Sequence, residues 1–121
     1  MERTRFIDHK GARILLLDFS GLADPEDAVK AITDAKAIVA SQPEKSVLTL
    51  TDVAGLSTDA ATVQALWELL RSNKPYVKAG AVVGVARGEQ DDLYHMLIHQ
   101  ARRDLPTFTD VEEAKDWLVD Q

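Results

Sequence analysis

Two histidines and an aspartate are the residues of this chain whose spacing best fits a metal ion. Asp91, His95 and His99 recur every four residues, so a helix would place them on one face. Imidazole and carboxylate groups are common metal ligands. The row lies opposite Leu93 and Leu97, which also fits a solvated helix face, and HMLIH lacks the glutamate of zinc-protease helices. A metal site here is therefore an alternative, and we expect no bound metal.

Three charged residues follow apolar segments that are typical of buried strands. Asp18 follows the segment 14–17, Asp52 follows 47–50, and Arg87 follows a valine-rich segment. In open parallel sheets, ligands bind beyond the carboxyl ends of the strands. We therefore assign Asp18, Asp52 and Arg87 as candidate ligand- or partner-binding residues. Asp52 could act as a phospho-acceptor or general base, or it could close a turn through its own backbone.

Two hydroxyl side chains, Ser57 and Thr58, precede a segment with helical periodicity. Either residue could cap the helix, because hydroxyl oxygens accept hydrogen bonds from free amide groups there. Alternatively, a phosphate on either one would be held by the same amides and by the helix dipole. Ser57 and Thr58 are therefore the candidate phosphorylation sites.

The composition excludes several classes of protein. The chain has 121 residues, of which 45% are hydrophobic and 28% charged, and it has no cysteine. This length fits one domain over residues 1–121. Without cysteine there is no disulfide, thiol nucleophile or iron–sulfur cluster. The net charge of −6 argues against non-specific nucleic-acid binding, which needs a basic surface.

Motifs for catalysis and targeting are missing from the sequence. It contains no phosphate-binding loop, no strand-linked G-x-G-x-x-G and no G-x-S-x-G, so we expect no enzymatic activity and no cofactor. The first residues lack the long apolar region of a signal peptide. No apolar run reaches the ~18 residues of a membrane span. We expect a cytoplasmic protein without stable membrane insertion.

Apolar runs and capping signals predict the elements that position these residues. Strands are expected over 5–8, 12–20, 47–50 and 77–86, with an edge strand over 105–108. Helices are expected from Pro25 to before Pro43, from a cap at Thr58 or Asp59 to about Asn73, over 89–103, and after a capping box at 109–112. The order β-β-α-β-α-β-α-(β)-α predicts an α/β sandwich with a mixed, mostly parallel sheet.

Helical periodicity also predicts which side chains face the core. The expected inward residues are Ala28, Ile32, Ala35 and Val39 in the first helix, Val63, Leu66, Trp67 and Leu70 in the second, Leu93, Met96, Leu97 and Ala101 in the third, and Val111, Ala114 and Leu118 in the last, where Trp117 is a further candidate. An open strand edge at 5–8 or near Phe108 predicts a symmetric homodimer.

Four segments, 9–21, 47–53, 73–85 and 108–118, together resemble the SpoIIAA-like branch of the STAS superfamily over nearly the whole chain. The resemblance implies a non-catalytic switch domain that binds a kinase-like partner. In that family a serine or threonine at the start of the helix after a central strand is phosphorylated. The family's Asp-Ser-Ser/Thr-Gly motif is not intact here, where residues 57–61 read Ser-Thr-Asp-Ala-Ala.

The resemblance leads to two expectations about function. The first is a regulatory or protein-interaction domain, similar to anti-sigma-factor antagonists and regulated by phosphorylation. The alternative is a binder of a small apolar or lipid-like ligand, because SpoIIAA-like proteins are similar in fold to Sec14-type lipid carriers.

Overall fold

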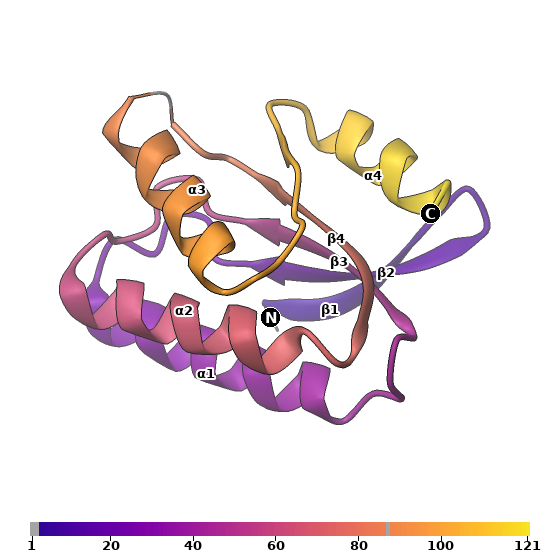
Figure 1. Ribbon diagram of the computed structural model, residues 1–121, viewed down its shortest axis with the longest axis horizontal. Helices are drawn as coiled ribbons and strands as arrows, with labels where there is room; N and C mark the ends of the chain where they lie inside the picture. Colours follow the sequence, from indigo (N-terminus) through magenta and orange to yellow (C-terminus); the bar gives the residue numbers. More distant parts are fainter. Residues whose placement is uncertain (1–2, 87) are drawn as a thin grey trace.

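Strands and helices alternate along residues 3–86 and 88–121, which are the residues that the computed structural model describes (Figure 1). Arg87, one of the candidate binding residues, lies outside them. The elements are β1 (Thr4–His9), β2 (Ala12–Asp18), α1 (Pro25–Ala40), β3 (Val47–Asp52), α2 (Ala60–Asn73), β4 (Val77–Val83), α3 (Glu89–Gln100), β5 (Thr107–Phe108) and α4 (Val111–Val119).

The strands form one mixed sheet in the order β1-β2-β3-β4-β5. β1 and β2 are antiparallel, and the other neighbouring pairs are parallel. Lys10 and Gly11 join β1 to β2 with φ angles of 49° and 84°, the positive values that a tight type I′ hairpin turn requires. The α/β class, the element order and the mixed sheet are therefore as predicted.

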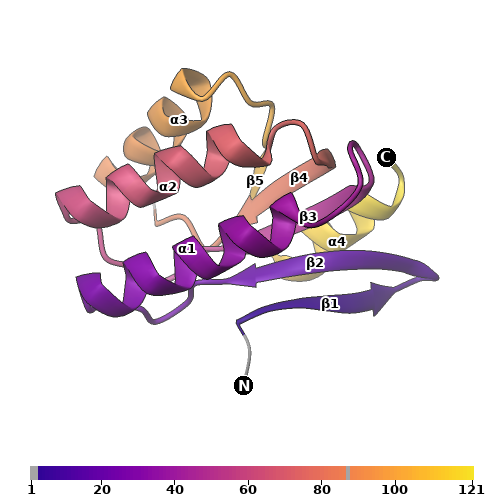
Figure 2. The same ribbon diagram turned by 90° about the horizontal axis from the view of Figure 1, so that it is seen from below.

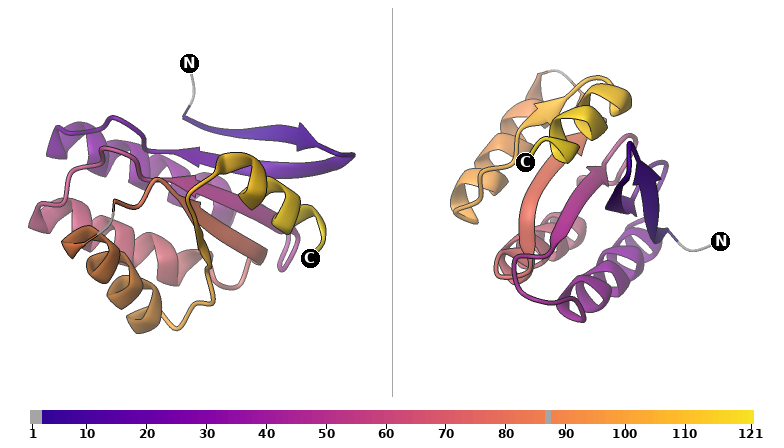
Figure 3. Two further views of the ribbon diagram at one scale, coloured as in Figure 1. Left: turned by 90° about the horizontal axis from the view of Figure 1, so that it is seen from above. Right: turned by 90° about the vertical axis from the view of Figure 1, so that its right-hand side faces the viewer.

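The helices lie on both faces of the sheet (Figures 2 and 3). α1 and α2 run side by side on one face, where α3 contributes Tyr94, Leu97 and Ile98 to the same apolar cluster. On the opposite face, α4 lies near the β1–β2 turn and buries Ala114 and Leu118 against the sheet. No helix in residues 3–86 and 88–121 has the length and apolar character needed to cross a membrane.

α1 forms as its sequence predicts. The Asp24 carboxylate caps the helix by accepting a hydrogen bond from the Glu26 amide, and Pro25 occupies the first turn. The predicted inward side chains are all buried, namely Ala28, Ile32, Ala35 and Val39. Burial of one large aliphatic side chain contributes roughly 1.5–3 kcal/mol, so this face holds the helix on the sheet.

The other helices match the predicted orientation only in part: Leu66, Leu97, Ala101, Ala114 and Leu118 are buried as predicted. α2 buries Thr62, Leu66, Leu69 and Asn73, whereas Val63, Trp67 and Leu70 are only partly buried. Met96 and Val111, predicted to face inward, are 47% and 39% exposed. The core takes Tyr94 and Ile98 from α3 instead. Periodicity located these helices correctly, but their rotation depends on partners distant in the sequence.

Several element boundaries also differ from the predictions. β2 ends at Asp18 rather than residue 20, β4 at Val83 rather than residue 86, and α3 at Gln100 rather than residue 103. The cap of α4 is Asp110, whose side chain accepts from the Glu112 amide, so the predicted capping box starts one residue too early. The strand ends matter most, because they set where the candidate side chains leave the sheet.

Candidate functional site

The loops after β2 and β3 are held together at the carboxyl ends of the strands, and we call this region the loop edge. Three backbone hydrogen bonds link them: Phe19 N to Asp52 O at 2.9 Å, Gly21 N to Ala54 O at 2.7 Å, and Ser57 N to Leu22 O at 2.8 Å. Because backbone groups form these links, a shift in one loop moves the other. The candidate residues on both loops therefore belong to one connected surface.

Asp18 and Asp52 end neighbouring parallel strands and are register partners. Alternation along the strands places them on the face that carries Leu16 and Leu50, the face that α4 partly covers. Neighbouring strands lie about 4.8 Å apart, so the two side chains leave the sheet next to each other. The structure thus brings together two of the three predicted binding residues.

The Asp18 carboxylate is fixed by its own loop. Its Oδ1 accepts hydrogen bonds from the Ser20 amide at 3.0 Å and from the Ser20 hydroxyl at 2.5 Å. Partial burial raises the pKa of Asp18, but the hydrogen bonds from Ser20 and the charges of Arg3 and Arg5 outweigh this, so the pKa lies below its ordinary value. Asp18 is therefore a carboxylate at neutral pH.

Asp52 closes a turn with its own backbone. Its Oδ1 accepts a hydrogen bond from the Ala54 amide at 3.0 Å. This is the geometry of an Asx-turn, which the sequence analysis gave as one of the alternatives for Asp52. Gly84, just after β4, packs directly on this turn with a φ of +85°. A side chain on Gly84 would overlap the turn, so Asp52 is held from both sides.

The start of α2 is capped by Asp59 rather than by either predicted phosphorylation site. Oδ1 of Asp59 accepts from the Thr62 amide at 3.1 Å, from the Thr62 hydroxyl at 2.5 Å and from the Ser57 hydroxyl at 3.0 Å. Hydrogen bonds from the Thr62 side chain and backbone are the main reason that the pKa of Asp59 lies below its ordinary value. Ser57 is half-buried against the cap, and Thr58 is exposed beside it.

The structure places two of the three candidate metal ligands, Asp91 and His95, close together. Nε2 of His95 lies 3.0 Å from Oδ1 of Asp91, and both side chains are about half exposed. His99 is exposed on the same helix. Among residues 3–86 and 88–121, no group of three histidine, aspartate or glutamate side chains is arranged to hold a metal ion. The Asp91–His95 contact is a solvent-exposed contact between side chains one turn apart on α3.

One polar cluster was missed by the sequence analysis. His9 and Lys10, at the β1–β2 turn, both contact Oδ1 of Asp116 on α4, at 2.7 Å and 2.8 Å. Glu112 lies 4.0 Å from the other nitrogen of His9. Hydrogen bonds from Lys10 and His9 hold the pKa of Asp116 below its ordinary value. No local pattern marks this contact, because its partners lie at opposite ends of the chain.

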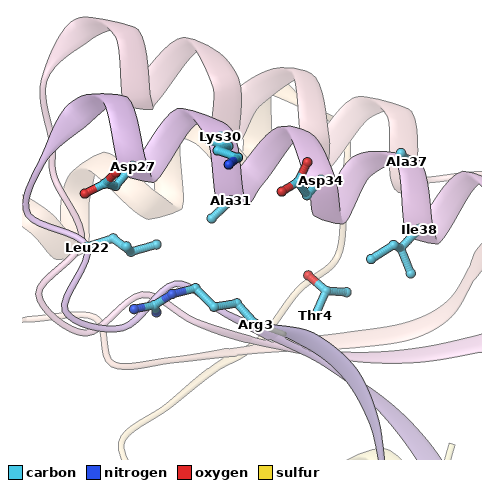
Figure 4. A pocket seen from close by; sticks show the side chains of 9 residues that line it. All are labelled: Arg3, Thr4, Leu22, Asp27, Lys30, Ala31, Asp34, Ala37 and Ile38. Carbon is cyan, nitrogen blue, oxygen red and sulfur yellow. The ribbon is translucent and has the colours of Figure 1, made fainter. Parts of the chain in front are cut away.

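A groove of about 800 Å³ lies between the start of β1 and α1 (Figure 4). Arg3 and Thr4 form one wall, and α1 supplies the other with charged and small apolar side chains. The lining also includes Leu22, Asp27, Lys30, Ala31, Asp34, Ala37 and Ile38. The core residues Leu15, Leu17 and Ile32 do not line the groove and are almost completely buried.

Comparison with known proteins identifies no family for this chain. No protein-family model matches it, and neither does any curated protein.

Proposed function

We propose that this domain is a non-catalytic regulatory module that binds a protein partner through the loop edge and is switched by phosphorylation of Ser57. The resemblance of the sequence to SpoIIAA-like STAS proteins suggested this class of function. The loop edge supports it, because Asp18 and Asp52 end neighbouring strands whose following loops, one of which carries Ser57, are joined by backbone hydrogen bonds. The partner would be kinase-like or another regulatory protein.

The contact between Ser57 and Asp59 carries the proposal. The Ser57 hydroxyl lies 3.0 Å from the carboxylate that caps α2. A phosphoryl group on Ser57 would bring about −1.5 to −2 charges against that carboxylate. The repulsion would displace Asp59 from Thr62 and free the first turn of α2. Phosphorylation would therefore act by breaking an existing cap rather than by filling an empty helix terminus.

Displacement of Ser57 would also affect the loop after β2. The Ser57 amide donates to the Leu22 carbonyl at 2.8 Å, so displacement of residue 57 also pulls on the loop that follows Asp18. The affected surface carries the carboxylates of Asp18, Asp52 and Asp59. A partner that recognises it would present basic side chains, because complementary charge steers association and sets specificity.

The switch is tested with protein that carries phosphoserine at position 57. We expect amide signals of 57–62 and 19–22 to shift in NMR spectra, and hydrogen exchange at the start of α2 to accelerate. The matched control carries phosphothreonine at the neighbouring, exposed Thr58, which makes no contact with Asp59 among the hydrogen bonds of the described residues. Unchanged exchange at α2 with phosphoserine 57 would contradict the switch.

The partner surface is tested separately by affinity capture from cells of the source organism. Protein with Asp18→Lys and Asp52→Lys should lose captured proteins that wild-type protein retains. Glu44→Lys, at an exposed residue before β3, is the control for a change of surface charge. If the wild-type and double-variant proteins capture the same set, the loop edge is not the binding surface. Phosphate on Ser57 in the same cells would show that the site is used.

A second candidate function rests on the groove beside α1. Its apolar Leu22, Ala31 and Ile38 lie beside both cations and carboxylates of the lining, which suits a lipid-like ligand with a polar head group. Native mass spectrometry with a fatty-acid series should give a one-to-one complex that Ile38→Glu abolishes. Binding unaffected by Ile38→Glu would exclude the groove as the ligand site.

A further inference from the structure

The two edges of the sheet differ in how they are protected. Unprotected edge strands expose backbone groups that can pair with another chain. β5, at one edge, has only two residues. β1, at the other, has six residues and pairs with β2 in one continuous register. Within residues 3–86 and 88–121, no strand covers the outer side of β1.

The hydrogen-bond pattern shows which residues of β1 point outward. Arg3 O accepts from Asp18 N, and His9 and Ala12 close the two-residue turn. Bonded and non-bonded residues alternate in an antiparallel pair, so the odd-numbered residues of β1 face β2. The backbone groups of Thr4, Phe6 and Asp8 therefore point away from the sheet.

Only part of this edge is open. Thr4 is 6% exposed and lies in the groove beside α1, so its edge is covered. Phe6 is 37% exposed, one of the few large apolar side chains at the surface, and Asp8 is exposed as well. The free backbone groups thus belong to two residues, with Ile7 midway between them.

We propose that a second copy of this chain pairs with β1 in antiparallel orientation, about a two-fold axis at Ile7. Phe6 of each copy then lies opposite Asp8 of the other. Each of these two pairs exchanges both backbone hydrogen bonds, so every open outward group on β1 is used. The two five-stranded sheets become one continuous sheet, and the interface has the self-complementary form of a cyclic dimer.

Charge complementarity favours a second copy over an unrelated strand. The Arg13 guanidinium lies over the Phe6 ring, 4.0 Å from its centroid. Asp8 of the same chain is the register partner of Arg13 on β2. In the dimer, the Asp8 carboxylate of the second copy lies beside the Phe6 ring and approaches the Arg13 charge as well. The same contact forms twice by symmetry. Because Arg13 of each copy attracts Asp8 of the other, the charges on this edge favour pairing with a second copy of the chain.

The opposite face of the paired strands is also complementary. Ile7 of each copy meets Ile7 of the other, which buries apolar surface left half-exposed in the monomer. The dimer edge is separate from the loop edge, so this proposal does not depend on the proposed function.

Sedimentation over a concentration series tests the dimer with charge variants. Wild-type protein should associate reversibly to a dimer. Phe6→Asp places two pairs of carboxylates in opposition and should raise the dissociation constant by at least about tenfold. Phe6→Asp combined with Asp8→Lys should restore it, which a folding defect would not allow. Met96→Asp, at the exposed apolar residue of α3, is the matched control and should leave the dimer unchanged.

Disulfide trapping tests the register, because the chain contains no cysteine of its own. Ile7→Cys should cross-link to itself rapidly, since facing residues of this type have Cα atoms about 4.5 Å apart, within disulfide range. A mixture of Phe6→Cys and Asp8→Cys should form the mixed dimer. Met96→Cys should cross-link slowly.

Three results would each overturn the proposal. They are a wild-type chain that stays monomeric at the highest concentration, an unchanged dissociation constant for Phe6→Asp, and faster self-linking by Phe6→Cys than by Ile7→Cys.

Discussion

Nε2 of His9 lies 2.7 Å from Oδ1 of Asp116, although 107 positions separate the two residues in the sequence. The same oxygen lies 2.8 Å from the Lys10 ammonium, so one carboxylate joins the β1–β2 turn to α4. α4 has only nine residues, and a helix of this length needs tertiary contacts to persist in water. The contact therefore orients the helix that covers the second face of the sheet.

Replacement of the Asp116 carboxylate should weaken the protein in a pH-dependent way. The pKa of Asp116 lies below its ordinary 3.8 and that of Lys10 above its ordinary 10.5, mainly because the two side chains are hydrogen-bonded to each other. The stabilisation is then full between about pH 5 and about pH 9 and is lost beyond either end. Asp116→Asn should lower the thermal midpoint near pH 7. In melts at lower pH, the difference from wild type should shrink as the pH falls below 3.8.

A constant difference down to the lowest pH would show that the Asp116 charge contributes nothing. Asp104→Asn, at an exposed carboxylate before β5, controls for the change in net charge.

Leu118 should be the main apolar anchor of α4. It is completely buried against the sheet, in the cluster with Ile14 and Leu50. Leu118→Ala removes these contacts and leaves a cavity, at a cost of about 2–5 kcal/mol. Urea unfolding measures the loss. Val111→Ala, at the exposed start of the same helix, should cost little, and equal effects of the two variants would contradict this packing.

Much of the fold was predictable because it depends on local signals. The Asp24-Pro25 start of α1, the Asp59 cap of α2 and the apolar runs of β2 and β3 are contained within short segments. The rotation of α2 and α3 was not predictable in this way. Thr62 and Asn73 are polar yet buried, whereas the apolar Met96 is exposed, because neighbouring helices decide which side faces inward.

The candidate site was predictable in its placement but not in its contacts. The strand-end rule brought Asp18 and Asp52 to one edge, and the register confirms that they are neighbours. The role of Asp59 as acceptor for both Ser57 and Thr62 depends on side-chain geometry that residue types do not specify. The contact of Gly84 with the Asp52 turn joins two strand ends and has no local signal.

Gly84 should tolerate no side chain. A Cβ there would lie 2.5 Å from the Ala54 nitrogen and 2.8 Å from Oδ1 of Asp52, in backbone with a φ of +85°. Gly84→Ala should therefore lower the free energy of unfolding by about 2–4 kcal/mol, from strain and overlap together. Gly11→Ala has a similar φ of +84° but open space around it, and should cost only about 1 kcal/mol. Equal losses in urea unfolding would show that the overlap relaxes freely.

Thr62 should stabilise the start of α2 through its hydroxyl. The side chain is completely buried, and its hydroxyl donates to the Asp59 carboxylate at 2.5 Å. Thr62→Val keeps the shape but removes the donor, at a cost of about 1–2 kcal/mol. The loss should disappear as acid protonates Asp59, whose pKa lies below its ordinary value. Urea unfolding at neutral and acidic pH measures this, with Thr62→Ser as the variant that retains the hydroxyl.

Replacement of Tyr94 by phenylalanine should leave the protein at least as stable as the wild type. Its side chain is 4% exposed, and its hydroxyl has no hydrogen-bond partner among the described residues. Burial raises the pKa of Tyr94 to about 12, which reflects the same lack of polar surroundings. A buried hydroxyl without a partner costs about 1–3 kcal/mol of desolvation, so Tyr94→Phe should leave stability unchanged or raise it by up to about 1 kcal/mol. Urea unfolding decides this: a loss of stability would mean that the hydroxyl is hydrogen-bonded in solution. Tyr94→Leu, which removes the ring as well, should be destabilising and shows that the assay detects damage at this position.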